Sequence, residues 1–212
     1  DEAKLERAVA ALRAEGHKAT GDAFDVTDPE AVEVTIGEIE AGGPLDILVN
    51  NAGIQRRMPL EQFPVETWHE LMRTNLDGVF YVGQAVAKRM IARRRGKIIN
   101  IASLMSEASR YSIAPYTASK GAVKNLTKGM CTDWARYNIQ VNGIGPGYFA
   151  TPLNKALMED QKFNAWLEAR TPAGRWGRLE ELQGACIFLA SAASDFVNGQ
   201  ILYVDGGVLA TV

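Results

Sequence analysis

Leu45-Asp-Ile-Leu-Val-Asn50 is a nearly continuous apolar run that passes directly into Asn51-Ala-Gly53, and it is the most informative segment of the chain. Runs of this kind are typical of parallel strands that are covered on both faces. Gly42-Gly43-Pro44 separates the run from an expected helix over residues 29–40, which starts with a proline and an acidic first turn. The stretch therefore predicts one helix–strand unit of a parallel sheet.

The alternation of helix and strand extends in both directions from this run. Such an alternation is typical of a doubly wound parallel sheet, and no linker, repeat or low-complexity segment interrupts it. We therefore expect residues 1–212 to form a single α/β domain. Further helices are expected over residues 2–15, 64–93, 116–137, 152–169 and 179–192, and further strands over residues 18–26, 97–102, 139–144 and 201–204.

The composition indicates an ordinary globular protein and argues against several classes of partner. The net charge of −2, with 47% hydrophobic and 23% charged residues, gives no reason to expect nucleic acid. No apolar run reaches membrane-spanning length and no signal peptide opens the chain, so we expect a cytoplasmic protein without a membrane partner. Two isolated histidines and two cysteines without metal-type spacing predict no metal site and two reduced thiols.

Candidate ligand-binding residues stand directly after the expected strands. In open parallel sheets, ligands bind outside the carboxyl ends of the strands. That edge would bring together segments that are far apart in the sequence. The residues concerned are Asp25, Val26, Asn51, Ala52, Gly53, Ser103, Pro146 and Gly147.

Tyr116 and Lys120 lie one turn apart near the start of an expected helix, on one of its faces. A tyrosine acts as an acid or base on a carbonyl only if its pKa falls from about 10 toward neutrality. A shift of about three units corresponds to roughly 4 kcal/mol, which one ammonium about 4 Å away supplies at an effective dielectric of about 20. The pair is sufficient for this chemistry, although the spacing alone is also typical of an ordinary exposed helix pair.

Two further polar residues fit the same chemistry. Ser103 follows the expected strand over residues 97–102, where its hydroxyl either binds a substrate oxygen that gains negative charge or caps a helix. Asn75 interrupts the apolar pattern of the expected helix over residues 64–93, and asparagine is a mediocre helix former. Its side chain either faces solvent or holds a water in a proton relay with Lys120.

Taken in order along the chain, these motifs resemble the short-chain dehydrogenase/reductase family. The resemblance implies a Rossmann-like, three-layer α/β/α fold and an enzyme that transfers a hydride between NAD or NADP and a secondary alcohol or ketone. The motifs are Asn50-Asn51-Ala52-Gly53, Asn75, Ser103, Tyr116-x-x-x-Lys120 and Pro146-Gly147-Tyr-Phe-Ala-Thr151, with thirteen residues from Ser103 to Tyr116, and the resemblance extends to Val204-Asp-Gly-Gly207.

The resemblance also implies a role for each catalytic residue. Tyr116 is the acid/base, and Lys120 lowers the pKa of Tyr116 while binding the nicotinamide ribose. Ser103 positions the carbonyl, and Asn75 maintains the water of the proton relay. All four are therefore expected catalytic residues, and Ser103 and Tyr116 are also expected to contact the substrate.

A dinucleotide site follows from the same resemblance. Asp25 and Val26 would flank the adenine. The backbone at residues 51–53 would approach the adenosine ribose, which glycine at the last position allows. The residues expected along the nicotinamide and the pyrophosphate are Pro146, Gly147, Phe149 and Thr151, with Tyr116 and Lys120 at the nicotinamide ribose.

One part of the family's pattern is not found in this sequence, namely the Gly-rich phosphate-binding turn Thr-Gly-x-x-x-Gly-x-Gly. Gly42-Gly43 ends a helix instead of opening one. We therefore expect a sheet without the family's first two strands, in a fragment of a longer protein that by itself binds the cofactor weakly. The residue that contacts the ribose 2′ position lies on the family's second strand, which this sequence is expected to lack. The sequence therefore does not distinguish NAD from NADP as the cofactor.

Arg56 and Arg57 follow the expected strand over residues 45–50 and offer guanidinium groups to a substrate carboxylate, the alternative being a solvated loop. With residues 143–151, 170–177 and 194–199, they resemble the family members that interconvert D-gluconate and 5-keto-D-gluconate. A sugar acid is therefore the expected substrate. Related alternatives are a 3-oxoacyl-carrier-protein reductase and another sugar or polyol dehydrogenase.

The last expectation concerns the oligomeric state of the protein. The family resemblance implies a homotetramer built through the helices expected over residues 64–93 and 116–137. An alternative of another class is a truncated, non-catalytic assembly partner. The intact set of four catalytic residues argues against that alternative, because a purely structural role would not require it.

Overall fold

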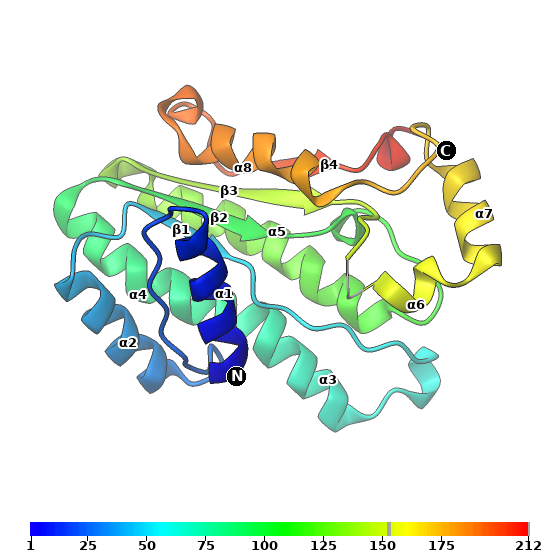
Figure 1. The fold of residues 1–212 in the computed structure, drawn as a ribbon, viewed down its shortest axis with the longest axis horizontal. Coiled ribbons are helices and arrows are strands. Elements are labelled where there is room, and N and C mark those ends of the chain that lie inside the picture. The colour runs from blue at the N-terminus through cyan, green and yellow to red at the C-terminus, as the bar shows by residue number, and fades with distance from the viewer. Residues whose placement is uncertain (152–153, 212) are drawn as a thin grey trace.

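Four parallel strands form the centre of the computed structural model, which describes residues 1–151 and 154–211. The strands lie in the order β1-β2-β3-β4, and each pairs in parallel with the next (Figure 1). This arrangement confirms the predicted parallel α/β sheet. The bounds are β1 (Ile47–Asn50), β2 (Gly96–Ile101), β3 (Ile139–Pro146) and β4 (Ile201–Val204).

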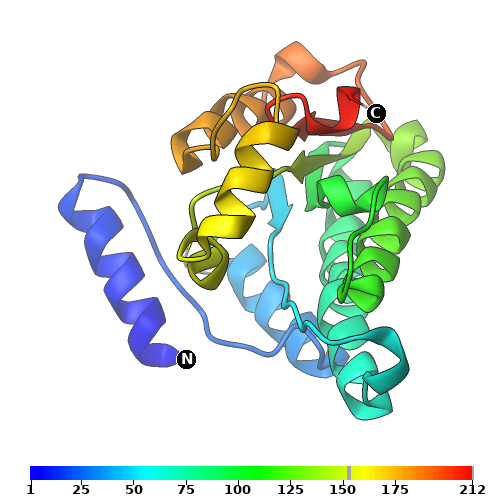
Figure 2. The same cartoon turned by 90° about the vertical axis from the view of Figure 1, so that its right-hand side faces the viewer.

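Helices cover both faces of the sheet (Figure 1, Figure 2). They are α2 (Pro29–Ala41), α4 (Gly78–Arg93), α5 (Ala114–Trp134) and α8 (Gln183–Ala190). Ile98 of β2 packs with residues of α2, α4 and α5 in one buried cluster, whereas its neighbour Ile99 packs with Leu189 of α8 in another. Because successive side chains of a strand point to opposite faces, the first three helices lie on one side of the sheet and α8 on the other.

The helix expected over residues 64–93 is divided. α3 (Val65–Met72) and α4 are joined by the π-helical segment Arg73–Asp77, which contains Asn75. A π-helical turn accommodates an extra residue and is frequent at functional sites. The apolar periodicity of the sequence does not reveal such a turn, so it predicted one uninterrupted helix.

The strand predicted over residues 18–26 is wrong, since none of these residues pairs into the sheet. A strand needs the backbone groups of a neighbour, and the described residues supply none beside this segment. Instead, Gly21 packs against α1 (Glu2–Ala14), where a Cβ would lie 2.6 Å from the Leu5 Cδ1. Figure 2 shows α1 standing apart from the sheet, and none of its residues is buried.

Two other expected helices are shorter in the structure. Residues 154–170 hold α6 (Lys155–Met158) and α7 (Gln161–Arg170), and the first two residues expected in this helical region, 152 and 153, lie outside the described part. Residues 179–182 form a 3₁₀ turn before α8 begins. Across the described chain, every helix is too short or too polar to cross a bilayer.

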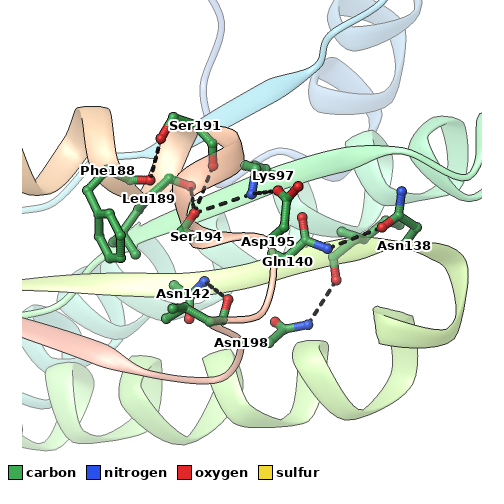
Figure 3. A network of polar contacts seen from close by, with 12 residues as sticks. Lys97, Asn138, Gln140, Asn142, Phe188, Leu189, Ser191, Ser194, Asp195 and Asn198 are labelled. Atoms are coloured by element: carbon green, nitrogen blue, oxygen red, sulfur yellow. Dashed lines mark hydrogen bonds and ion pairs between the residues drawn. The ribbon is translucent and has the colours of Figure 1, made fainter.

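Side-chain amides hold the start of β3 against the segment that leads into β4 (Figure 3). Asn198 accepts a hydrogen bond from the Val141 N–H at 2.7 Å and donates one to the Ile139 carbonyl at 3.1 Å. Asn142 makes an equivalent pair of bonds to backbone groups just before β4. These bonds extend the backbone pairing of β3 and fix the register at which β4 joins the sheet.

We predict that Asn198→Ala lowers the free energy of unfolding by about 2 kcal/mol, because two backbone groups of β3 lose their partner. Equilibrium urea denaturation measures this change. Gln161→Ala, at an exposed position of α7, is the matched control and should change stability by less than about 0.5 kcal/mol. Equal effects of the two variants would contradict the role of Asn198 in holding β3.

Candidate active site

The carboxyl ends of the strands open into a cavity of about 430 Å³. Segments that follow β1, β2 and β3 line it, together with the loop before α5 and the start of α8. This is the edge at which parallel sheets bind ligands. Of the residues predicted from the sequence, the cavity is lined by Asn51, Gly53, Arg57, Ser103, Tyr116, Lys120, Pro146, Gly147, Phe149 and Thr151.

Ser103 lies just beyond the end of β2, and the backbone holds its hydroxyl in place. The Ser103 Oγ accepts a hydrogen bond from the Met105 N–H at 3.1 Å, which makes Ser103 the N-cap of the 3₁₀ turn Leu104–Ser106. This cap uses only the acceptor capacity of the oxygen. The hydroxyl proton is therefore available to a ligand oxygen in the cavity, so the two alternatives considered for Ser103 are compatible.

Tyr116 lies in the first turn of α5 and lines the cavity. Burial raises the pKa of its phenol, while the Ser103 hydroxyl and the positive charge of Arg57 act in the opposite direction. Burial dominates because the phenolate loses more hydration than the neutral phenol does. The phenol is therefore protonated at neutral pH, which is the form that donates a proton to a ketone oxygen.

Lys120 is buried beneath the cavity, with 5% of its surface exposed. Its Nζ donates a hydrogen bond to the Ile101 carbonyl at 2.7 Å and lies 5.8 Å from the centre of the Tyr116 ring. Burial lowers the pKa of this ammonium to about 8, because the charged form loses its hydration. Burial of the phenol outweighs the Ser103 hydroxyl and the Arg57 charge, which lower the Tyr116 pKa in this structure. The predicted lowering of that pKa by Lys120 stays a prediction.

Asn75 is fully buried in the π-helical segment between α3 and α4. Its Oδ1 accepts a hydrogen bond from the Ile54 N–H at 2.7 Å, and its Nδ2 donates to the Ile54 carbonyl at 2.9 Å and to the Ser119 hydroxyl at 3.2 Å. These bonds exclude the alternative of a solvent-facing side chain. Asn75 therefore joins the turn after β1 to α5, and its part in a proton relay stays a prediction.

Gly53 brings the backbone of that turn close to two of the candidate catalytic groups. A Cβ at Gly53 would lie 3.4 Å from the Asn75 Oδ1 and 3.8 Å from the Lys120 Nζ. A larger side chain would therefore fill the space beside the ammonium. Both distances are ordinary van der Waals contacts, so they do not by themselves require glycine, and close approach of a cofactor to this backbone stays a prediction.

The remaining candidate cofactor residues, Asp25, Val26 and Ala52, do not line the cavity. Asp25 is exposed and accepts a hydrogen bond from the Thr27 N–H at 2.8 Å, which lowers the pKa of its carboxyl. Val26 packs against Gly78, where a Cβ would lie 2.9 Å from the Val26 Cγ2. Contact of these residues with an adenine or its ribose stays a prediction.

The structure separates the two arginines that the sequence did not distinguish. Arg56 forms an ion pair with Glu70 at 2.6 Å and lies outside the cavity. Arg57 is half-buried and lines the cavity, and its one side-chain hydrogen bond within the described chain is a long contact of 3.4 Å with Gln55. Arg57 is therefore the better placed of the two to bind a substrate.

Known proteins match the chain over nearly its whole length. Residues 1–209 match the family profile described as enoyl-(acyl carrier protein) reductase. The chain is 60% identical over 205 residues to gluconate 5-dehydrogenase of Gluconobacter oxydans (strain 621H), a match that covers 96% of this chain and 80% of that protein. It is 54% identical over 210 residues to 5-keto-D-gluconate 5-reductase of Escherichia coli (strain K12), covering 99% of this chain and 83% of that protein.

The chain belongs to the short-chain dehydrogenase/reductase family. A solved structure supports the assignment: the crystal structure of a gluconate 5-dehydrogenase from Burkholderia cenocepacia J2315 in complex with NADP and tartrate. It matches with a TM-score of 0.97 and 60% identity, covering 100% of this chain and 84% of that one. The protein is thus a nicotinamide-dependent oxidoreductase, as the order of its motifs predicted.

The cavity of this short-chain dehydrogenase/reductase is also lined by residues that were not predicted from the sequence as site residues, among them Arg110 and Tyr148. Arg110 belongs to the loop before α5, and Tyr148 follows β3. An arginine in a polar loop is most often solvated. Tyr148 lies within the motif of residues 146–151, in which residues 146, 147, 149 and 151 were assigned to the cofactor and Tyr148 was not. No local pattern identifies either residue, because only the fold brings their loops to one cavity.

We predict that Lys120→Met stabilises this short-chain dehydrogenase/reductase while it removes activity. Folding lowers the pKa of Lys120 from 10.5 to about 8, so below that pH the folded state carries a buried charge that the unfolded state keeps hydrated. At pH 7 this cost is on the order of 3 kcal/mol. Loss of the hydrogen bond to Ile101 offsets part of the gain.

The stabilisation should shrink as the pH rises, because folded wild-type protein loses the Lys120 proton through a pKa of about 8. Between pH 7 and pH 9.5 the difference between variant and wild type should fall by about 2 kcal/mol. Urea denaturation at both values measures it. Lys162→Met, on an exposed position of α7, is the control and should change stability by less than about 0.5 kcal/mol at both values. A Lys120→Met effect that is constant with pH would argue against a buried charge.

Proposed function

We propose that the protein interconverts D-gluconate and 5-keto-D-gluconate with NADP as its cofactor. The observation that carries the proposal is a single cavity lined by Ser103, Tyr116, Lys120 and the guanidinium of Arg57. The first three groups suit proton transfer at a carbonyl, and a guanidinium suits the carboxylate of a sugar acid. The names of the relatives at 54% and 60% identity support this substrate.

NADP is proposed because the similar gluconate 5-dehydrogenase from Burkholderia cenocepacia was solved in complex with it. The residues at the cavity fit the nicotinamide end of such a molecule. Asn51 and Gly53 are exposed on one side, and Gly147 and Thr151 line another. These residues and Lys120 would hold the nicotinamide and its ribose. When bound, the nicotinamide supplies or accepts the hydride.

The chain's own groups move the proton. In ketone reduction, the Ser103 hydroxyl donates a hydrogen bond to the ketone oxygen, and the Tyr116 phenol gives that oxygen its proton as negative charge develops there. The Lys120 ammonium is close enough to favour the resulting phenolate. In the reverse direction, the phenolate takes the proton of the alcohol. Asn75 fixes the turn beside Lys120, and holding a relay water there is part of this proposal.

The function is tested by following nicotinamide absorbance with the full-length protein, NADPH and 5-keto-D-gluconate. We expect oxidation of NADPH, and Tyr116→Phe should lower kcat by about 100-fold or more because the proton donor is removed. Turnover of neutral ketoses or acyl-carrier ketones, with none of 5-keto-D-gluconate, would refute the proposed substrate.

We predict that Arg57→Ala raises the KM for D-gluconate by about 10- to 100-fold, because a charge-assisted contact with the carboxylate is lost. The KM for neutral D-sorbitol should change by less than about 2-fold, since this polyol has no carboxylate. Arg56→Ala is the matched control: its guanidinium pairs with Glu70 outside the cavity, so both constants should stay near those of the wild type. Steady-state kinetics with both substrates decide, and equal effects of Arg57→Ala on the two KM values would count against the assignment.

The direction of the Tyr116 pKa shift predicts opposite pH dependences for the two directions of the reaction. Burial raises the pKa of Tyr116, so the protonated phenol persists at neutral pH and ketone reduction should not accelerate from pH 7 to 9. Alcohol oxidation needs the phenolate and should accelerate over the same range. Initial rates at saturating cofactor test this, and oxidation that is fastest below pH 7 would contradict it.

We also propose a homotetramer assembled through the helices of residues 65–93 and α5. Support comes from large apolar side chains that are exposed on α3 and α4, with Val65 of α3 63% exposed and Phe80 of α4 41% exposed. Exposed apolar area of this kind favours packing against another subunit. Sedimentation at micromolar concentration tests the proposal, and a monomer under these conditions would refute it.

A further inference from the structure

The cavity carries more positive charge than the proposed proton transfer uses. Its lining includes Arg57, Arg110 and Lys120, whereas no Asp or Glu of the described chain lines it. The net charge of residues 1–212 is −2, so this concentration of positive charge is local. Like charges that share a cavity repel one another, and such local conflicts are expected at functional sites, where they attract a ligand of opposite charge.

Arg110 is held in the cavity by an aromatic ring and not by an acidic residue. Its guanidinium carbon lies 5.2 Å from the centre of the Phe163 ring, which belongs to α7. The Nε of Arg110 is buried and has no hydrogen-bond partner among the described residues. An unpaired buried donor is unfavourable, so a ligand that accepts a hydrogen bond here would offset that cost.

Tyr148 adds a second unpaired polar atom to the same cavity. Its hydroxyl is buried and makes no hydrogen bond of standard geometry with the described residues, although the Arg110 guanidinium lies close to it. Its ring packs edge-on against Phe163, with centroids 5.6 Å apart. Burial raises the pKa of this phenol, and the charges of Arg110 and Arg57, together with a polar contact between Arg110 and the hydroxyl, oppose the rise. Arg57, Arg110 and Tyr148 line the same cavity, so one ligand can contact all three.

The loops that carry Arg57 and Arg110 are joined directly. The Met58 N–H donates a hydrogen bond to the Ser112 carbonyl at 3.0 Å. Burial lowers the pKa of Arg57, and the charge of Arg110 lowers it further. Neither arginine takes part in the ion pairs formed among residues 1–151 and 154–211. The repulsion between the two guanidinium groups would be offset by an anion bound between them.

We propose that Arg110 and Tyr148, together with Arg57, bind the carboxylate end of the substrate, and that Arg110 selects sugar acids over neutral sugars. A carboxylate has about four acceptor sites on two oxygens, so two guanidinium groups and a phenol can share it. The inference rests on the proposed function, whose substrate carries one carboxylate. It assigns Arg110 to substrate selection and leaves the proton transfer to Ser103 and Tyr116.

The test compares two substrates that differ only at C1, D-gluconate with a carboxylate and D-sorbitol with a hydroxymethyl group. Arg110→Met keeps the apolar stem of the side chain over Phe163 but removes its charge. It should lower kcat/KM for D-gluconate by about 30- to 300-fold and that for D-sorbitol by less than about 3-fold. Tyr148→Phe should lower kcat/KM for D-gluconate by about 3- to 10-fold.

Arg136→Met is the matched control. Arg136 also lies over an aromatic ring, with its guanidinium carbon 4.9 Å from the centre of the Tyr137 ring, but on an exposed surface outside the cavity. This variant should leave both kcat/KM values near those of the wild type. Equal losses for D-gluconate and D-sorbitol in Arg110→Met would overturn the inference and assign Arg110 to packing on α7, and unchanged kinetics would overturn it as well.

Calorimetric titration of D-gluconate into the full-length protein with NADP gives a readout without turnover. The Kd should rise by about 30-fold or more in Arg110→Met, and wild-type affinity should fall with ionic strength. If wild type oxidises D-gluconate and Arg110→Met matches it in both assays, the inference fails and the proposed function stands. If wild type binds D-gluconate in an Arg110-dependent way without oxidising it, the carboxylate site stands and the proposed function fails.

Discussion

The Lys120 ammonium, buried beneath the cavity with the Ile101 carbonyl as its acceptor, is the interaction on which the rest of the site depends. Removing a cation from water is unfavourable, so the surrounding backbone has to hold it in a defined place. β2 supplies the carbonyl and, two residues further, Ser103. α5 supplies the lysine and, one turn earlier, Tyr116. One hydrogen bond thus aligns the end of a strand with the start of a helix, and the candidate catalytic groups meet as a consequence.

A buried amide connects the end of β1 to α5 in a similar way. Asn75 binds both backbone groups of Ile54 and the Ser119 hydroxyl, so it joins the turn after β1 to α5 across the fold. The π-helical segment that carries Asn75 departs from regular helix geometry where the fold needs this contact. Arg57 follows the same turn. Its position at the cavity therefore depends on Asn75 as well as on its own loop.

Much of the fold follows from local patterns. Continuous apolar runs locate β1, β2, β3 and β4 to within two residues. β2 and β3 are buried on both faces, as such runs predict, whereas Ile47 and Val49 of β1 are 46% and 41% exposed, so β1 is not covered on both faces by the described residues. The segment over residues 18–26 shows the limit of this reasoning, since its pattern suits a strand but its backbone has no described neighbour to pair with. The division between α3 and α4 shows another limit, because apolar spacing does not reveal a π-helical turn.

The sequence by itself determined the family, the reaction class and the four candidate catalytic residues, since these depend on residue types at fixed spacings along one chain. Only the tertiary structure decided that Arg57 and not Arg56 faces the cavity, and that Arg110 and Tyr148 join it there. The tertiary structure also decided the directions in which the pKa values of Tyr116 and Lys120 shift. The physical reason is common to all of them: loss of water and contact between distant loops arise only once the strands are aligned and the cavity has closed around their ends.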